Sequence, residues 1–159
     1  MNLSPKSGMH QWRIQDVRVN AKTGCVENGM PKMFEQPFSK ERVKLRSGGS
    51  FEFDAVSADK TLVANISTSG ARTASGKHAV GKKMKLRPDI YFLLLTEASR
   101  KLIILCEADM HALCKREYDA GRIPKEIEFF HVALPATLAS KLVVARKISS
   151  EEVSPLRNR

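Results

Sequence analysis

FEFDAVS occupies residues 51–57, and TLVANIST follows shortly after it at residues 61–68. Both segments are rich in β-branched and aromatic residues, which favour extended strands. A two-residue loop at Asp59 and Lys60 would close them into an antiparallel hairpin. Upstream, RVKLR at residues 42–46 alternates polar and apolar side chains and precedes a turn, SGGS. These three segments therefore predict an antiparallel meander.

The register of the hairpin predicts which side chains share a face. A two-residue loop places Asp54 opposite Asn65, and side chains two positions away lie on the same face. That face would also carry Glu52, Val56, Val63 and Ser67, and the opposite face Phe53, Ala55, Leu62, Ala64 and Ile66. The first face thus offers carboxylates, an amide and a hydroxyl. Carboxylate and carbonyl oxygens are the ligands that a hard divalent cation such as Mg²⁺ prefers.

The rest of the chain alternates helical and strand patterns. Apolar runs at residues 90–96 and 102–106 predict strands that are buried on both faces. The other expected elements are a basic helix that ends before Pro88, a helix at 107–120 stopped by Gly121, a strand at 127–134, and a helix from Pro135 to about Ile148. This order predicts an α/β fold: a mixed β-sheet with an antiparallel meander and helices on both faces.

The length of 159 residues fits one domain. We expect the α/β domain to span residues 41–148. Residues 1–40 are predicted to be an irregular N-terminal segment, because residues 23–37 are rich in Gly, Pro and Asn. Within that segment, the apolar side chains between residues 12 and 19 suggest one short helix or strand. Residues 149–159 are predicted to be a frayed C-terminal tail.

Composition excludes several classes of protein. No run approaches the roughly 18 apolar residues of a membrane span, and the polar first nine residues lack the apolar core of a signal peptide. The three cysteines are odd in number and form no CxxC pair, so we expect neither a disulfide framework nor structural zinc. The expectation is a protein of the reducing cytoplasm with no membrane partner.

The formal net charge of +10 is unevenly distributed. Residues 61–88 contain no Asp or Glu, and a one-sided positive field favours contact with the phosphates of DNA or RNA. The cations of this region, which are the candidate nucleic-acid-binding residues, are Arg72, Lys77, Lys82, Lys83, Lys85 and Arg87. The alternative is a non-catalytic protein-interaction or structural module with a basic surface. The oligomeric state stays open, with a homodimer among the options.

Residues 42–134 resemble the PD-(D/E)xK, or restriction-endonuclease-like, superfamily. The resemblance rests on Asp54 in a central strand, a second strand, a helix and a further strand at residues 90–96. It implies a metal-dependent nuclease fold in which Asp54 takes the place of the metal-binding Asp. The acid-x-Lys pair of that family would fall on residues 65–67, where Asn65 and Ser67 replace the acid and the lysine.

These departures from the family pattern define the expected site. Glu52 would replace the lost acid and hold Mg²⁺ together with Asp54, while Lys77, or Lys44 on the neighbouring strand, would supply the lost cation. The catalytic candidates are accordingly Asp54, Glu52, Asn65, Ser67 and Lys77. We expect a nucleic-acid-binding protein of nuclease-like fold whose metal-dependent phosphodiesterase site is degenerate or inactive.

A second phosphate-binding pattern overlaps this region. The small-residue loop at 69–76, followed by Lys77 and a helix, resembles a P-loop. The spacing does not match, because Ala71 stands where the first glycine is needed and His78 where the metal-binding Ser or Thr is needed. A P-loop NTPase is therefore disfavoured, although the loop amides and Lys77 could still cradle a nucleic-acid phosphate.

Overall fold

The computed structural model describes residues 13–72 and 80–152, without the side chains of residues 80–85 and 150–152. Within these residues a sheet of five strands forms the centre of the fold. The strands are β1 (Phe38–Lys44), β2 (Ser50–Ser57), β3 (Leu62–Ser67), β4 (Arg100–Leu105) and β5 (Ile127–His131). They lie in chain order, with β1 to β3 as an antiparallel meander and β3 to β5 parallel. The predicted meander is therefore confirmed.

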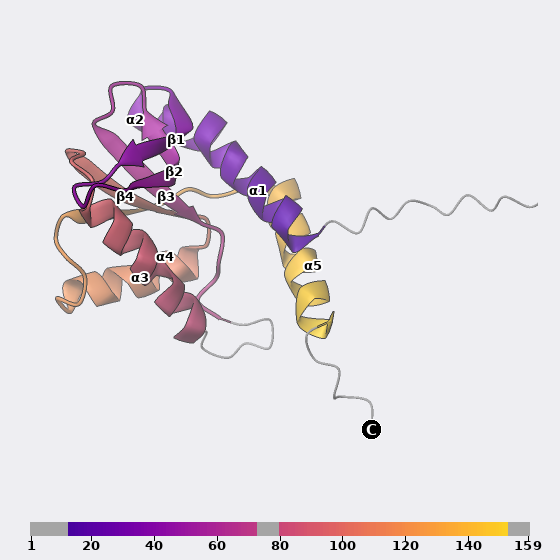
Figure 1. Ribbon diagram of the computed structural model, residues 1–159. Coiled ribbons are helices and arrows are strands. Elements are labelled where there is room, and N and C mark those ends of the chain that lie inside the picture. Colours follow the sequence, from indigo (N-terminus) through magenta and orange to yellow (C-terminus); the bar gives the residue numbers. More distant parts are fainter. Residues whose placement is uncertain (1–12, 73–79, 153–159) are drawn as a thin grey trace, which may run out of the picture.

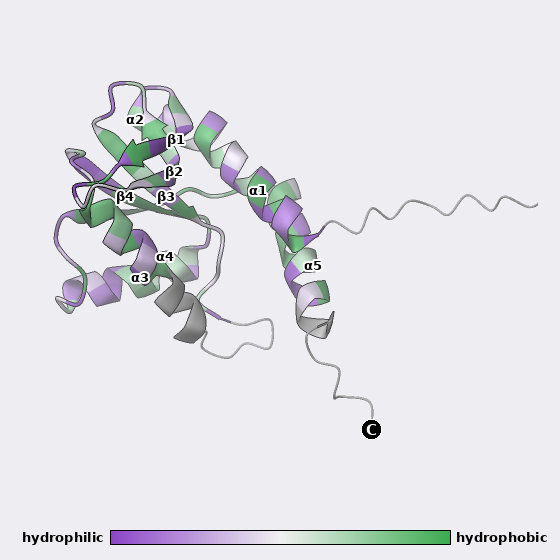
Figure 2. Ribbon diagram, viewed as in Figure 1, coloured by the Kyte–Doolittle hydropathy of each residue, from purple (hydrophilic) through white to green (hydrophobic). Residues whose placement is uncertain are grey.

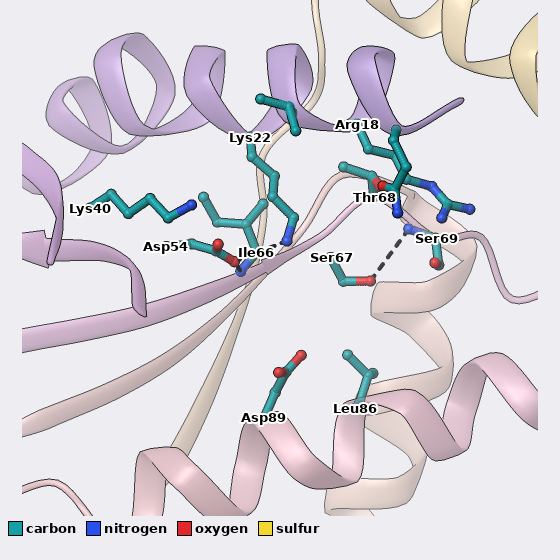
Figure 3. A pocket seen from close by; sticks show the side chains of 12 residues that line it. Arg18, Lys22, Lys40, Asp54, Ile66, Ser67, Thr68, Ser69, Leu86 and Asp89 are labelled. Atoms are coloured by element: carbon teal, nitrogen blue, oxygen red, sulfur yellow. Dashed lines mark hydrogen bonds and ion pairs between the residues drawn. The ribbon is translucent and has the colours of Figure 1, made fainter. Parts of the chain in front are cut away.

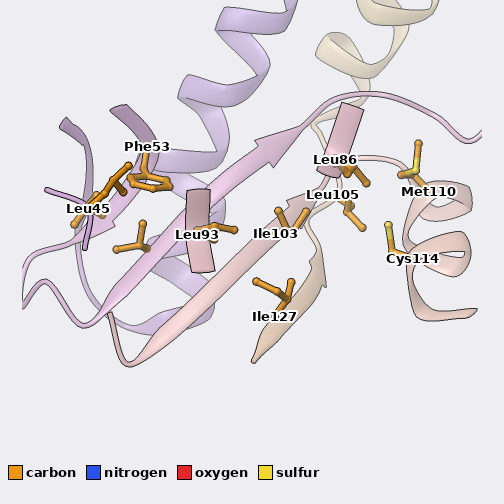
Figure 4. Close-up of a cluster of buried hydrophobic side chains, with 11 residues drawn as sticks. Leu45, Phe53, Leu86, Leu93, Ile103, Leu105, Met110, Cys114 and Ile127 are labelled. Carbon is orange, nitrogen blue, oxygen red and sulfur yellow. The ribbon is translucent and has the colours of Figure 1, made fainter. Parts of the chain in front are cut away.

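The helices of the described residues are α1 (Ile14–Gly24), the π-helical turn η1 (Cys25–Gly29), α2 (Met30–Phe34), α3 (Val80–Leu94), α4 (Ala108–Asp119) and α5 (Ala136–Glu152). They cover both faces of the sheet (Figure 1). On one face, Leu93 of α3 and Met110 of α4 pack with Ile103 of β4 in a buried cluster (Figure 4). On the other face, Met30 of α2 packs with Ile104 of β4. A mixed sheet between helices confirms the predicted α/β class.

Helices α1 and α5 lie side by side and extend beyond the sheet (Figure 1). Val17 of α1 and Leu142 and Ala145 of α5 are buried in their contact. Figure 2 shows central strands that are mostly hydrophobic, whereas α1 alternates between hydrophobic and hydrophilic residues. One face of α1 therefore packs against α5, and the polar side chains of α1 lie on the other sides of this helix.

A β-bulge in β2 changes the predicted sorting of side chains. The hairpin register agrees with the prediction, because Val56 pairs with Val63. Beyond this point, two steps along β1 (Ser39 to Glu41) correspond to three steps along β2, so β2 carries an extra residue. The extra residue inverts the alternation, and Phe53 packs in the same cluster as Val56. The prediction that Phe53 shares a face with Ala55 is therefore wrong.

The predicted strand at residues 90–96 is also wrong, because α3 continues through Pro88 as far as Leu94. Apolar runs of this length do not distinguish a buried strand from a helix. In the helix the run has two sides: Leu93 is fully buried, whereas Tyr91 is 58% exposed. The strand that follows α3 is instead β4.

The N-terminal prediction fails for a different reason. Residues 14–34 are helical throughout rather than irregular, and Pro31 stands where the π-helical turn passes into α2. Gly29 permits a close approach, since a Cβ there would lie 2.5 Å from Cγ1 of Val132. The glycines of this segment thus serve packing rather than chain reversal.

The C-terminal half follows the prediction more closely. Helix α4 ends before Gly121, which has a positive φ of 74°, as expected for a residue that stops a helix. Helix α5 extends to Glu152, past the predicted start of the frayed tail. None of the helices in the described ranges combines the length and the apolar character that a membrane span requires.

Candidate functional site

A cleft of about 290 Å³ opens where β2 and β3 separate, with α1 on one side and α3 on the other (Figure 3). The paired residues of the two strands end at Ala55 and Ala64, and beyond them Asp54 of β2 and Ile66 of β3 border the cleft. Its polar lining comprises Gln15, Arg18 and Lys22 of α1, Lys40 of β1, Asp54 of β2, Ser67 to Ser69 at the end of β3, and Asp89 of α3. Elements from both faces of the sheet therefore meet at one place.

Asp54 lies at the point of separation and bridges the two strands. Its Oδ2 accepts a 2.8 Å hydrogen bond from the main-chain N–H of Ile66, and its own N–H points at Oδ1 of Asn65, 3.5 Å away. These side-chain bonds take over where the backbone ladder stops. The Asp54 side chain is 18% exposed, so its carboxylate is held in place yet reaches the cleft.

Lys22 reaches the same carboxylate from α1. Its Nζ lies 3.2 Å from Oδ2 of Asp54, the oxygen that also accepts the bond from Ile66. The sequence pattern missed Lys22, because residues 1–40 carried no helical signal strong enough to place its side chain. Figure 3 shows Lys22 and Lys40 both pointing toward Asp54.

Asp89 points into the cleft from α3, opposite the strands (Figure 3). The pKa of Asp89 is raised to about 6, mainly by burial and then by the negative charge of Asp54, while the positive charge of Lys22 partly opposes both effects. Asp54 and Asp89 thus face a shared space and repel each other when both are ionised. The sequence pattern missed Asp89 because the helix was expected to end before Pro88.

The predicted acid pair does not form. Glu52 is exposed and bonds Nζ of Lys40 at 3.2 Å, and it is not among the residues that line the cleft. Lys44 pairs with Ser50 at the far end of β2, away from Asp54. The acid that shares the cleft with Asp54 is Asp89, from a helix rather than from the same strand.

The other predicted catalytic residues have mixed outcomes. Asn65 is buried, and its Nδ2 has no hydrogen-bond partner among the described residues. Ser67 lines the cleft, and its Oγ accepts a 3.3 Å bond from the N–H of Ser69. Lys77 lies outside the described residues, as do the side chains of Lys82, Lys83 and Lys85. Arg72 and Arg87 are exposed, and neither lines the cleft.

The described residues contain no group of three or more His, Cys, Asp or Glu side chains that could hold a metal ion. The cleft itself offers two carboxylates, and Mg²⁺ commonly binds through one or two carboxylates while it keeps several waters. The donor set therefore fits a partly hydrated, hard cation better than a metal held entirely by side chains.

Comparison with known proteins gives no match to a family model, to a curated protein or to a solved structure. The cleft itself therefore carries the functional argument.

Proposed function

We propose that this chain binds nucleic acid at the cleft and hydrolyses a phosphodiester there with the aid of a divalent cation. The observation that carries this proposal is the convergence of Asp54, Asp89 and Lys22 from a strand and two helices on one small space. Two carboxylates with a neighbouring ammonium can hold a cation and, beside it, an anionic phosphate.

The raised pKa of Asp89 supports a cation site. Burial and the charge of Asp54 both oppose the ionisation of Asp89, and the charge of Lys22 offsets them only in part. A divalent cation would remove that repulsion and keep both carboxylates ionised. Mg²⁺ is the ion that best fits this oxygen-only donor set, and when bound it supplies Lewis-acid polarisation of the phosphate.

Lys22 is suited to the role that we expected of Lys77. Its Nζ and the N–H of Ile66 share one oxygen of Asp54, so the ammonium lies beside residues 65–67, where the acid-x-Lys pair would fall in the superfamily that the sequence resembles. From there it would bind a non-bridging phosphate oxygen and stabilise the charge that develops in the transition state. Ser67 stands where the acid-x-Lys pair has its lysine, and its hydroxyl would donate a neutral hydrogen bond to the phosphate, weaker than that of an ammonium.

The order of elements also supports the resemblance. Asp54 stands on β2, and β3, α3 and β4 follow in the sequence of strand, helix and strand on which the resemblance rests. The last strand of that series is β4 rather than residues 90–96, which leaves the order unchanged.

The charge of the cleft favours a polyanionic ligand. Arg18, Lys22 and Lys40 line it together with two acids, and the chain as a whole has a net charge of +10. Backbone phosphates of DNA or RNA would be attracted to this surface. Their affinity would fall steeply as the salt concentration rises, because the release of counterions on binding then becomes less favourable.

The test is cleavage of labelled single-stranded DNA, duplex DNA and RNA with Mg²⁺, with Mn²⁺ and with EDTA. We expect cation-dependent cleavage that falls at least 100-fold in Asp54→Asn, in Asp89→Asn and in Lys22→Met. Asp119→Asn, at an exposed position on α4, is the matched control and should keep full activity. Equal cleavage by the wild type and Asp54→Asn would exclude the cleft as the site.

A further inference from the structure

Helix α1 presents a polar stripe to the cleft. Gln15, Arg18 and Lys22 are spaced by three and four residues, so they lie on one side of the helix, and all three line the cleft. Val17 and Ala21, on the other side, are buried. Arg18 and Lys22 are one turn apart, about 6 Å along the helix axis.

The two cations of this stripe differ in their partners. Lys22 is paired with Asp54, whereas Arg18 has no hydrogen bond or ion pair with any described residue. Burial, and then the nearby positive charge of Arg146, lower the pKa of Arg18. The Arg18 guanidinium is thus partly desolvated and close to a like charge, and it forms no ion pair with a carboxylate of the described residues.

Arg146 of α5 already has anionic and neutral acceptors of its own. Its NH1 bonds Oε1 of Glu107 at 2.9 Å, and its NH2 donates to the main-chain carbonyl of Thr68. The Nε of Arg146 is buried without a hydrogen-bond partner among the described residues. Glu107 is thus paired with Arg146, and among the described residues Arg18 has the like charge of Arg146 nearby but no ion pair of its own.

Three residues with hydroxyl groups line the cleft together with Arg18. Ser67, Thr68 and Ser69 line the cleft at the end of β3, and Figure 3 shows Arg18 reaching over Thr68 and Ser69. Serine and threonine hydroxyls donate hydrogen bonds to phosphate oxygens, and an arginine can donate two parallel bonds to the same group.

We infer that Arg18, with the hydroxyls of Ser67 and Ser69, forms a second phosphate subsite, which binds the phosphate next to the scissile one in a nucleic-acid strand. The inference rests on the proposed function, because Asp54, Asp89 and Lys22 mark the scissile position. The one-turn spacing of Lys22 and Arg18 is comparable to the separation of neighbouring phosphates along an extended strand. Helix α1 would thus follow the backbone of the strand across the cleft.

The first test measures binding without cleavage, in EDTA, as the affinity for a single-stranded oligonucleotide at several salt concentrations. Arg18→Gln should bind about tenfold more weakly, with a salt slope smaller by about 1, because one phosphate contact is lost. Arg116→Gln removes an exposed arginine of α4 and should leave both quantities unchanged. Arg18→Lys keeps the positive charge but loses the paired N–H donors of the guanidinium. It should restore most of the salt slope of the wild type but less of its affinity.

The second test uses a phosphodiester with a single phosphate, bis(p-nitrophenyl) phosphate, beside the oligonucleotide. Arg18→Gln should raise the KM for the oligonucleotide about tenfold and leave the hydrolysis of the single-phosphate ester unchanged. Asp54→Asn should abolish the hydrolysis of both. If the wild type binds the oligonucleotide but cleaves neither substrate, the phosphodiesterase proposal fails. The change in salt slope between the wild type and Arg18→Gln then decides whether Arg18 contacts a phosphate.

Several outcomes would overturn the subsite. One is an equal loss of affinity in Arg18→Gln and Arg116→Gln, and another is an equal effect of Arg18→Gln on both substrates. A third is competition by inorganic phosphate that disappears in Arg18→Gln while oligonucleotide affinity is unchanged, which would assign the subsite to free phosphate. Absence of oligonucleotide binding by the wild type at low salt would overturn both proposals. Thermal unfolding of each variant verifies that it is folded.

Discussion

The main-chain N–H of Ile66 donates a 2.8 Å hydrogen bond to the carboxylate of Asp54, at the point where their two strands separate. This bond orients the carboxylate toward the cleft and at the same time replaces a backbone hydrogen bond of the sheet. Asp54 thus has a structural role that does not depend on any ligand.

Asp54→Ala should therefore cost stability as well as activity. The substitution leaves the N–H of Ile66 and the ammonium of Lys22 without their acceptor, and we expect a loss of about 1–3 kcal/mol in the free energy of unfolding. Asp54→Asn keeps an acceptor oxygen and should lose less than about 1 kcal/mol. Urea denaturation of the two variants measures the difference, and equal losses would contradict the role of this hydrogen bond.

Asp89 should make stability depend on pH. The pKa of Asp89 is raised to about 6 by burial and by the charge of Asp54, so the folded state holds this proton more tightly than the unfolded state does. The contribution favours folding below about pH 4 and is lost as the pH rises through about 6. Asp89→Asn should then exceed the wild type in stability by about 2 kcal/mol above pH 7, after allowance for partial exposure, and should match it near pH 4.

Urea denaturation from pH 4 to pH 8 tests this expectation. Asp119→Asn, at an exposed position on α4, serves as the control and should follow the wild type at every pH. A difference between wild type and Asp89→Asn that stays constant over this range would contradict the raised pKa.

Cation binding should be coupled to the same proton. Because a cation binds the ionised form of Asp89, the affinity for Mn²⁺ should increase as the pH rises through about 6 and then level off. Titration calorimetry in two buffers of different ionisation enthalpy should detect proton release at pH 5.5 and almost none at pH 8. Asp54→Asn and Asp89→Asn should each bind Mn²⁺ at least tenfold more weakly, whereas undiminished binding would locate the cation elsewhere.

Gly29→Ala should destabilise the fold despite the higher helix propensity of alanine. The added Cβ would lie 2.5 Å from Cγ1 of Val132, and we expect the resulting strain to outweigh the gain of about 1 kcal/mol in propensity, for a net loss of about 1–2 kcal/mol. Gly49→Ala is the matched control, since a Cβ there meets no atom within 4 Å. Adding Val132→Ala to Gly29→Ala should recover part of the loss, and strict additivity of the two changes would argue against the contact.

Local patterns were sufficient for the meander and for the position of Asp54. The register that pairs Val56 with Val63 follows from the length of one loop, and alternation along residues 62–66 correctly groups Leu62, Ala64 and Ile66 on one face. Alternation failed at Phe53, because a bulge adds a residue to β2 without any mark in the sequence. Periodicity also failed at residues 90–94, where a continuous apolar run gave a helix the appearance of a strand.

By itself, the sequence determined the α/β class, the hairpin that carries Asp54 and the excess of positive charge, since these depend on local preference and composition. Only the tertiary structure decided that Lys22, 32 residues before Asp54, and Asp89 from α3 meet at that carboxylate while Glu52 turns away to Lys40. The physical reason is that periodicity reports which side of an element is buried. Which other element covers that side, and which side chains it brings there, is decided by packing among segments far apart in the chain.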